Sequence, residues 1–242
     1  DRDTNIRYGY LRRFGRLEGR FYALSHLFVW TMMLVVLVDN LGLMWVAIEA
    51  TTLVSALLVA FKFTKTSLEA AWKYVMVCTV GICLALLGTI LLYYAQILAL
   101  GGAQALDSQY LAANGSALNP ALAKVAFCFL FVGYGTKVGL APMHAWLPDA
   151  HSEAPALTSG LLSGSLCICA IYVLLRNVII IMLAVGMDFI SSLFLFFGLL
   201  TIALAIPFVV VQRDIKRMLA YSSMENFGLM AAGFGLFIPV AV

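Results

Sequence analysis

Charged residues are scarce in this sequence. Asp, Glu, Lys and Arg make up 11% of its 242 residues, whereas 63% are hydrophobic. Soluble domains contain about 25% charged and about 45–50% apolar residues. So few charges cannot cover a water-soluble surface, so most side chains must face lipid or one another. The net charge of +3 is also too small to indicate a nucleic-acid-binding protein.

Paired cysteines are missing as well. None of the five cysteines belongs to a C-x-x-C pair; they are Cys78, Cys83, Cys128, Cys167 and Cys169. Zinc and iron–sulfur sites use closely spaced cysteines. We therefore expect no metal and no cofactor in this chain, and we expect all five cysteines to be small buried residues.

Long apolar stretches are abundant instead. Each is about 20 residues long, which is enough for an α-helix to cross a bilayer. They predict an all-α fold, a polytopic transmembrane bundle. Its seven predicted spans are 21–38, 42–61, 68–98, 120–148, 156–183, 189–211 and 215–237.

The basic residues outside these spans or near their ends are divided unequally between the two ends of the bundle. Eleven fall at the end that holds the N-terminus: Arg2, Arg7, Arg12, Arg13, Arg16, Arg20, Lys62, Lys65, Arg213, Lys216 and Arg217. Two fall at the other end, Lys124 and Arg176. Basic loops stay in the cytoplasm. We therefore expect a multi-pass protein of the cell inner (plasma) membrane whose Arg2–Arg20 end is cytoplasmic.

The stretch 120–148 is predicted to be a discontinuous helix. Four residues that weaken or interrupt helices surround Lys137: Gly133, Gly135, Gly139 and Pro142. Backbone groups freed at membrane depth are tolerated where protein or water satisfies them, and broken helices are typical of ion sites in transporters. The alternative is a kink that serves packing alone.

Glu49 is the second charge expected deep in the membrane. It lies about ten residues into its span, which is near the middle of the bilayer at about 1.5 Å per residue. A buried charge costs several kcal/mol unless it is functional or paired. Lys137 is its natural partner, and separating the two would favour release of the lysine proton. A purely structural ion pair is the alternative.

Three further titratable residues are candidates for a proton path. Lys73 follows Glu69 by four residues, so it is either an interfacial ion pair or a relay towards the cytoplasm. His144 and His151 follow Lys137 at intervals of seven and would share its face if the helix resumed after the break. Histidine titrates near neutral pH, but both histidines could also be structural.

Several segments carry a family likeness: residues 43–49, 71–74, 135–137, 141–151 and 214–223. Together they resemble the antiporter-like subunits of respiratory complex I and of Mrp-type cation/proton antiporters. Two details, residues 151–155 and 223–226, resemble the membrane-bound hydrogenase branch, in particular component F of hydrogenase 4.

This resemblance implies about fourteen helices with two inverted five-helix units, a transporter architecture. The chain would be a fragment with a basic segment (1–20), a first unit (21–183) and the start of a second (189–242). Glu49 and Lys137 would carry protons, with Lys73 a further family lysine. In relatives the helix after the break bears a lysine or histidine, whereas Ile168 lies nearest that position here, so we expect His144 and water to replace it.

The implied function is proton translocation by a membrane subunit of a hydrogenase or NADH:quinone oxidoreductase. Such a subunit contacts other membrane subunits of the assembly and the lipid bilayer. It contacts the hydrophilic iron–sulfur and hydrogenase subunits only indirectly, and the ion moved is H⁺ or Na⁺. Two alternatives stay open, a subunit of a multisubunit cation/proton antiporter and a scaffold that has lost transport.

Overall fold

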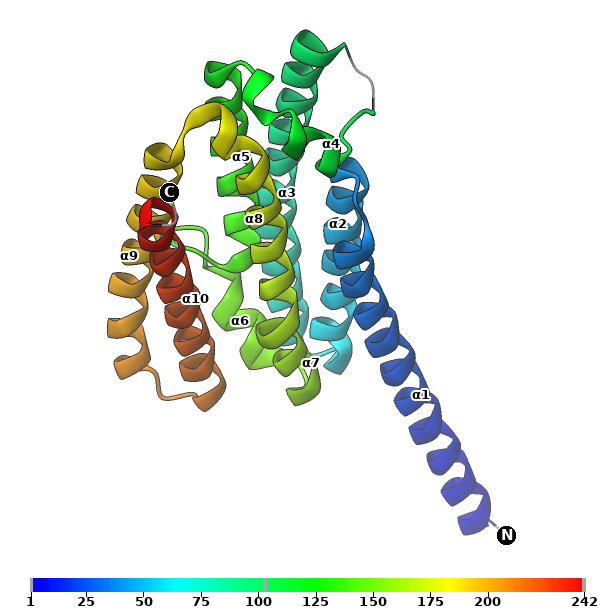
Figure 1. The fold of residues 1–242 in the computed structure, drawn as a ribbon. Helices are drawn as coiled ribbons and strands as arrows, with labels where there is room; N and C mark the ends of the chain where they lie inside the picture. The colour runs from blue at the N-terminus through cyan, green and yellow to red at the C-terminus, as the bar shows by residue number, and fades with distance from the viewer. Residues whose placement is uncertain (1, 102–103, 241–242) are drawn as a thin grey trace.

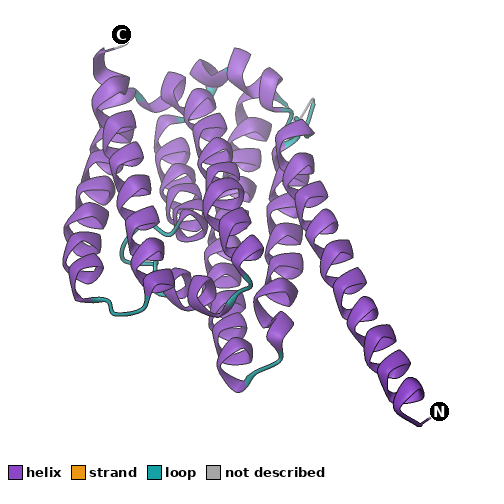
Figure 2. Ribbon diagram, turned by 90° about the horizontal axis from the view of Figure 1, so that it is seen from below, coloured by secondary structure: helices purple, strands orange, loops and turns teal. Residues whose placement is uncertain are grey.

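The computed structural model describes residues 2–101 and 104–240, with the side chains of residues 2–16 and 237–240 outside the description. The basic side chains expected at Arg2, Arg7, Arg12, Arg13 and Arg16 therefore lie outside the described part of the protein. The described chain is built from helices and short loops (Figure 2), and its one β-bridge joins Asn40 and Asp107.

The helices run up and down the bundle in chain order (Figure 1). They are α1 (Arg2–Leu37), α2 (Leu41–Val59), α3 (Lys65–Leu100), α4 (Ser108–Ala113), α5 (Pro120–Val138), α6 (Trp146–Glu153), α7 (Ala156–Leu161), α8 (Cys167–Val185), α9 (Met187–Val211) and α10 (Ile215–Val240). Two 3₁₀ turns, Ala60–Lys62 and Gly115–Ala117, and one π-helical segment, Leu162–Leu166, connect them. The N-terminal part of α1 extends away from the bundle.

Six helical segments are long and apolar enough to cross a membrane, which confirms the predicted polytopic helical fold. They are Leu17–Leu37, Leu41–Lys62, Lys65–Leu100, Pro120–Val138, Ala156–Val185 and Met187–Val211. The predicted seventh span, 215–237, forms α10, which has 26 residues and lies beside α9. In the part of the chain that the structure describes, α10 is not among the six, and it carries the polar residues Ser222, Ser223, Glu225 and Asn226.

The helix ends that carry basic residues lie together. The turn between α2 and α3 and the turn between α9 and α10 are at the same end of the bundle, towards which the N-terminus of α1 also points (Figure 1). Lys62 and Arg213 belong to these two turns. The arrangement agrees with the prediction that the basic clusters share one side.

The predicted discontinuous helix is present, but its break lies after Lys137. Helix α5 ends at Val138, Gly139 caps it with φ of +87°, and α6 begins at Trp146. Gly139 and Pro142 lie in the break, whereas Gly133 and Gly135 were wrongly assigned to it.

Gly133 and Gly135 lie inside the continuous part of α5. Gly133 is there for close packing: a Cβ atom at this position would lie 2.5 Å from the backbone nitrogen of Ala85 in α3. Small residues allow membrane helices to approach closely. Gly133 thus allows α5 to pack closely against α3. This contact fixes the position of Lys137, one turn further along α5, relative to α3.

Candidate functional site

Lys137 is fully buried in the last turn of α5. Its Nζ atom donates hydrogen bonds to the Oγ1 of Thr52 in α2 and to the hydroxyl of Tyr74 in α3, each at 2.8 Å. A buried ammonium group is costly unless its donors are satisfied. Three helices therefore converge on this nitrogen, and two hydroxyl groups replace part of the water that it would have outside the membrane.

The backbone at the break is also satisfied by protein groups. The indole nitrogen of Trp146 donates to the carbonyl of Thr136 at 2.8 Å, and the amide of Ala141 donates to Thr201 Oγ1 in α9 at 2.9 Å. Irregular backbone at membrane depth persists where such partners exist. Trp146 also packs its ring against Tyr74, with centroids 4.8 Å apart, so the segment after the break supports a ligand of Lys137.

Glu49 is linked to Lys137 through Thr52. Its Oε2 atom lies 3.4 Å from Thr52 Oγ1, which is the atom that accepts from Lys137. In the described part of the chain, no ion pair within 4.0 Å joins Glu49 and Lys137 directly. The structure thus brings the two predicted charges to one site, with a hydroxyl group between them.

Ile168, where the resemblance places the missing carrier, lies on the outer face of α8, and its side chain is 48% exposed. Its neighbour Cys167 is fully buried, and its sulfur atom lies 3.9 Å from the carbonyl oxygen of Lys137. A helix places adjacent residues about 100° apart, so neighbours can face the interior and the lipid. Of these two residues, Cys167 is therefore the one that faces the backbone of Lys137.

Lys73 lies in an exposed network rather than in the buried one. Its side chain is 51% exposed, and its ammonium group pairs with Glu69 at 2.8 Å and with Asp149 at 3.4 Å. Asp149 also pairs with Arg217 of α10 at 3.0 Å, so the network ties α3, α6 and α10 together. These contacts fit the interfacial ion pair that the spacing of Glu69 and Lys73 predicts.

The two histidines do not share a helical face with Lys137, because residues 139–145 are not helical. His144 lies in this turn. Its Nδ1 atom is buried and makes no hydrogen bond with any described residue. His151 is buried in α6. It lines an open cavity of about 420 Å³ together with Lys216, Ser163 and Ser223. The predicted alignment required the same helix to resume after the break, whereas residues 139–145 separate α5 from α6 as a non-helical turn.

Sequence reasoning missed the three hydroxyl residues of the site, Thr52, Tyr74 and Ser55. Ser55 Oγ lies 2.7 Å from the Tyr74 hydroxyl, and all three side chains are fully buried. One signal was available: Thr52 and Ser55 follow Glu49 at intervals of three, which places them along one side of α2. No local pattern indicates that Tyr74 of α3 faces them.

The expectation that all five cysteines are buried was wrong at two positions, Cys83 and Cys128. Cys78, Cys167 and Cys169 are buried, Cys128 is partly buried, and Cys83 is exposed on the outside of the bundle. A free cysteine behaves as a small apolar residue, so it is tolerated on the outside of a membrane bundle as well as in its core.

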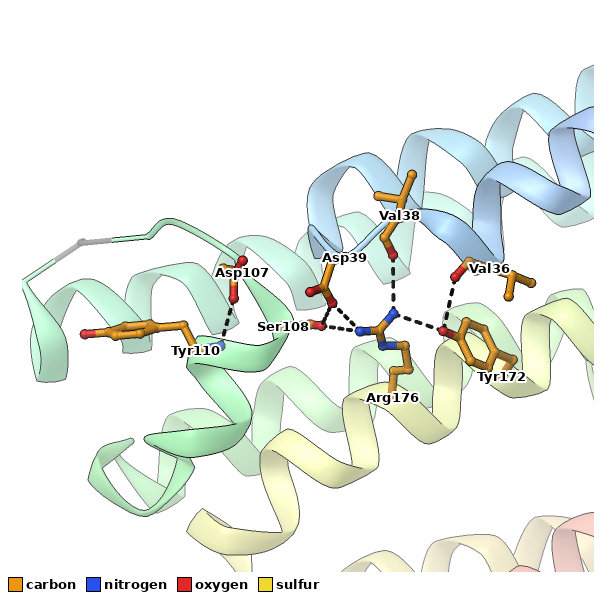
Figure 3. Close-up of polar contacts among 8 residues, drawn as sticks. All are labelled: Val36, Val38, Asp39, Asp107, Ser108, Tyr110, Tyr172 and Arg176. Atoms are coloured by element: carbon orange, nitrogen blue, oxygen red, sulfur yellow. Dashed lines mark hydrogen bonds and ion pairs between the residues drawn. The ribbon is translucent and has the colours of Figure 1, made fainter.

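A second polar cluster closes the opposite end of the bundle (Figure 3). Arg176 of α8 pairs with Asp39, which precedes α2, and donates to Ser108 Oγ at 2.6 Å and to the hydroxyl of Tyr172 at 2.9 Å. The hydrogen bond from Ser108, together with the Arg176 guanidinium, holds the pKa of Asp39 below its ordinary value. Arg176 is therefore a structural anchor, not a side chain that merely extends to the membrane surface.

Comparisons with known proteins agree with this geometry. The chain is 40% identical over 219 residues to the "Hydrogenase-4 component F homolog" of Methylacidiphilum infernorum (isolate V4), covering 90% of this chain and 46% of that protein. The chain thus spans about half the length of this relative.

Two solved structures share the fold. A chain of the membrane-bound sulfane sulfur reductase, an archaeal respiratory membrane complex, superposes with a TM-score of 0.79 at 25% identity, over 88% of this chain and 42% of that one. A chain of the Mrp complex from Dietzia sp. DQ12-45-1b does so with a TM-score of 0.77 at 28% identity, over 89% and 23%.

The matching family model is described as "NADH:quinone oxidoreductase/Mrp antiporter, TM" and covers residues 38–239, which include α2, Lys137 and the break after it. The chain therefore belongs to the NADH:quinone oxidoreductase/Mrp antiporter transmembrane family.

Proposed function

We propose that this chain is the first part of a proton-translocating membrane subunit of a respiratory redox complex. The observation that carries the proposal is the fully buried Lys137 at a helix break, hydrogen-bonded through Thr52 towards Glu49. Ionisable residues inside a membrane mark ion paths and proton relays. Electron transfer would take place in partner subunits, and this subunit would move H⁺ in response.

The relatives favour a complex of the membrane-bound hydrogenase or NADH:quinone oxidoreductase type. One is named as a hydrogenase component, and one belongs to a respiratory membrane complex. The partners of this chain would then be other membrane subunits and, indirectly, hydrophilic iron–sulfur or hydrogenase subunits. In this proposal residues 21–183 form the first five-helix unit, residues 189–242 begin an inverted second unit, and the Arg2–Arg20 end is cytoplasmic.

A cation/proton antiporter subunit is the second candidate, because the fold also matches a chain of an Mrp complex. Affinity purification of the full-length protein from its native membrane separates the two. Co-purification with hydrogenase or iron–sulfur subunits supports the redox complex, whereas co-purification with small antiporter subunits alone supports the second candidate.

The proposed function predicts that Glu49 and Lys137 carry transport. Glu49→Gln and Lys137→Met keep the size of the side chains but remove the charges. In sealed vesicles that contain the assembled complex, each variant should lower the rate of proton transport at least about a hundredfold, the lower end of the range for loss of a proton-transfer group. A pH-sensitive dye reports the transport, and the redox reaction of the partner subunits is measured in parallel.

Lys124→Met is the matched control, since Lys124 lies on the same helix but is exposed. It should leave transport at the parental rate. If the assembled Glu49 and Lys137 variants also transported at that rate, these residues would be structural and the proposed function would be wrong.

A further inference from the structure

Thr52 occupies the space between the two buried charges. Its side chain is fully buried in α2, and its Oγ1 atom lies 2.8 Å from Lys137 Nζ and 3.4 Å from Glu49 Oε2. Among the described residues, it is the side chain that hydrogen-bonds both groups. A proton that moves between Lys137 and Glu49 needs an atom within hydrogen-bond reach of each, because the two groups are not in direct contact.

The hydroxyl proton of Thr52 has no strong acceptor in its own helix. Its two acceptors, the carbonyl of Ile48 and the carboxylate of Glu49, both lie at 3.4 Å. The neighbouring Thr51 differs, because its hydroxyl donates to the same Ile48 carbonyl at 2.6 Å. Hydrogen bonds weaken beyond about 3.2 Å. The Thr52 hydroxyl can therefore turn towards Glu49, while the Thr51 hydroxyl is held by the backbone.

We propose that the Thr52 hydroxyl is a proton relay between Lys137 and Glu49, an inference that rests on the proposed function. One N–H bond of the Lys137 ammonium breaks as that proton binds Thr52 Oγ1. The original O–H bond of Thr52 breaks as its proton passes to the Glu49 carboxylate. The products are a neutral amine, a neutral carboxylic acid and an unchanged threonine, so protons and charge balance. A hydroxyl group suits this step because it donates one hydrogen bond and accepts two.

The distance of 3.4 Å between Thr52 Oγ1 and Glu49 Oε2 does not prevent proton transfer. Glu49 and Thr52 lie three residues apart on one helix, so rotation of the Glu49 side chain shortens the distance without moving the backbone. Catalytic hydrogen bonds are often long in resting structures and tighten during turnover. The relay would thus be open or closed according to the position of the carboxylate.

Tyr74 and Ser55 complete the relay as positioning residues. The hydroxyl of Tyr74 accepts a hydrogen bond from the Lys137 ammonium and lies 2.7 Å from Ser55 Oγ. The Ser55 hydroxyl in turn donates to the carbonyl oxygen of Thr51 at 2.6 Å. When Lys137 becomes neutral, its nitrogen gains a lone pair, and the Tyr74 hydroxyl can donate to it while accepting from Ser55. Both protonation states of the lysine are therefore satisfied by reversing hydrogen bonds, with the heavy atoms in place.

Thr52→Val tests the relay in the assembled full-length complex in sealed vesicles. Valine keeps the shape of threonine and removes the hydroxyl. Coupled proton transport should fall about a hundredfold or more, as for loss of a general acid–base group, while partner redox chemistry without a proton gradient stays at the parental rate. Thr52→Ser should restore most of the transport. Thr51→Val, which removes a hydroxyl held by the backbone one residue away, should transport as the parent does.

A second measurement reports proton transfer itself. The ratio of transport rates in H₂O and D₂O should rise in Thr52→Val, where proton transfer without the hydroxyl limits the rate, and it should stay at the parental value in Thr52→Ser and Thr51→Val. A parental ratio in a slowed Thr52→Val would show that the lost step is not proton transfer and would overturn the relay. If Thr52→Val does not assemble, Thr52→Ala is compared with Thr52→Ser, and the proposal requires the serine variant to be the faster of the two.

The outcomes separate this inference from the proposed function. Parental transport in Thr52→Val, or equal transport in Thr52→Ala and Thr52→Ser, overturns the relay while Glu49→Gln and Lys137→Met still block transport. Parental transport in those two charge variants overturns the proposed function itself. An equal loss in Thr51→Val and Thr52→Val would show a packing effect of α2 and would also overturn the relay.

Discussion

At the scale of single residues, the site shows how one buried ammonium group is stabilised with few charges. Lys137 is surrounded by two hydroxyl groups, and the nearest carboxylate is one hydroxyl further away. Hydroxyl groups stabilise the charged lysine less than a direct carboxylate would. They also satisfy the neutral lysine, which a carboxylate cannot do. The site is therefore compatible with both protonation states.

Tyr74 should stabilise the fold mainly because Lys137 is present. Tyr74→Phe removes an acceptor of a buried cation, which costs about 1.5–3 kcal/mol for a hydrogen bond to a charged group. In a Lys137→Met background, the same change should cost only about 0.5–1.5 kcal/mol, the range for a neutral hydrogen bond. Thermal unfolding of the four proteins in detergent gives the coupling energy. Equal costs in both backgrounds would show that Tyr74 does not solvate Lys137.

At the scale of elements, the end of α5 decides where Lys137 lies. Gly139 has φ of +87°, and a Cβ atom there would come within 2.5 Å of a Leu147 methyl carbon. The left-handed conformation lets the chain leave the helix directly after Val138. The following turn then brings Trp146 back to the Thr136 carbonyl, so the break is a defined structure with its own hydrogen bonds.

Gly139→Ala should therefore destabilise the protein. The left-handed backbone costs roughly 1–2 kcal/mol for a residue with a Cβ atom, and the contact with Leu147 adds to this cost. Gly160→Ala is the control, because no atom lies within 4 Å of a Cβ atom at that helical position. That change should be neutral or should stabilise the helix by roughly 0.5–1 kcal/mol. Thermal denaturation of both variants in detergent checks the difference, and equal stabilities would contradict it.

At the scale of the whole molecule, hydropathy predicted the bundle well because the bilayer selects for long apolar helices. The seventh predicted span, 215–237, forms α10, whose apolar pattern is interrupted by Glu225 and Asn226. The helix break was predicted from glycine and proline. Its position was not, because Gly133 serves packing against Ala85, a contact that local sequence does not reveal.

Of the candidate site, the sequence alone predicts only the two charged residues. Glu49 and Lys137 stand out because charged residues are costly in an apolar span. Thr52, Tyr74 and Cys167 do not stand out, since their importance depends on which faces of α2, α3 and α8 meet. The same holds for Ile168 and Cys167, because an apolar sequence does not reveal which of two neighbours faces the interior of the bundle.

The topology of the molecule gives the last prediction. Both turns that carry basic clusters lie at one end of the bundle, and the segment between α3 and α5 lies at the other (Figure 1). Single cysteines at Lys65, Arg213 and Ser116 test this in a variant whose native cysteines are replaced by alanine. These positions are exposed, so each thiol can react. In oriented vesicles, a membrane-impermeant maleimide should label the first two from one side and Ser116→Cys from the other. If Lys65→Cys and Arg213→Cys were labelled from opposite sides, the bundle would not have an even number of crossings between them.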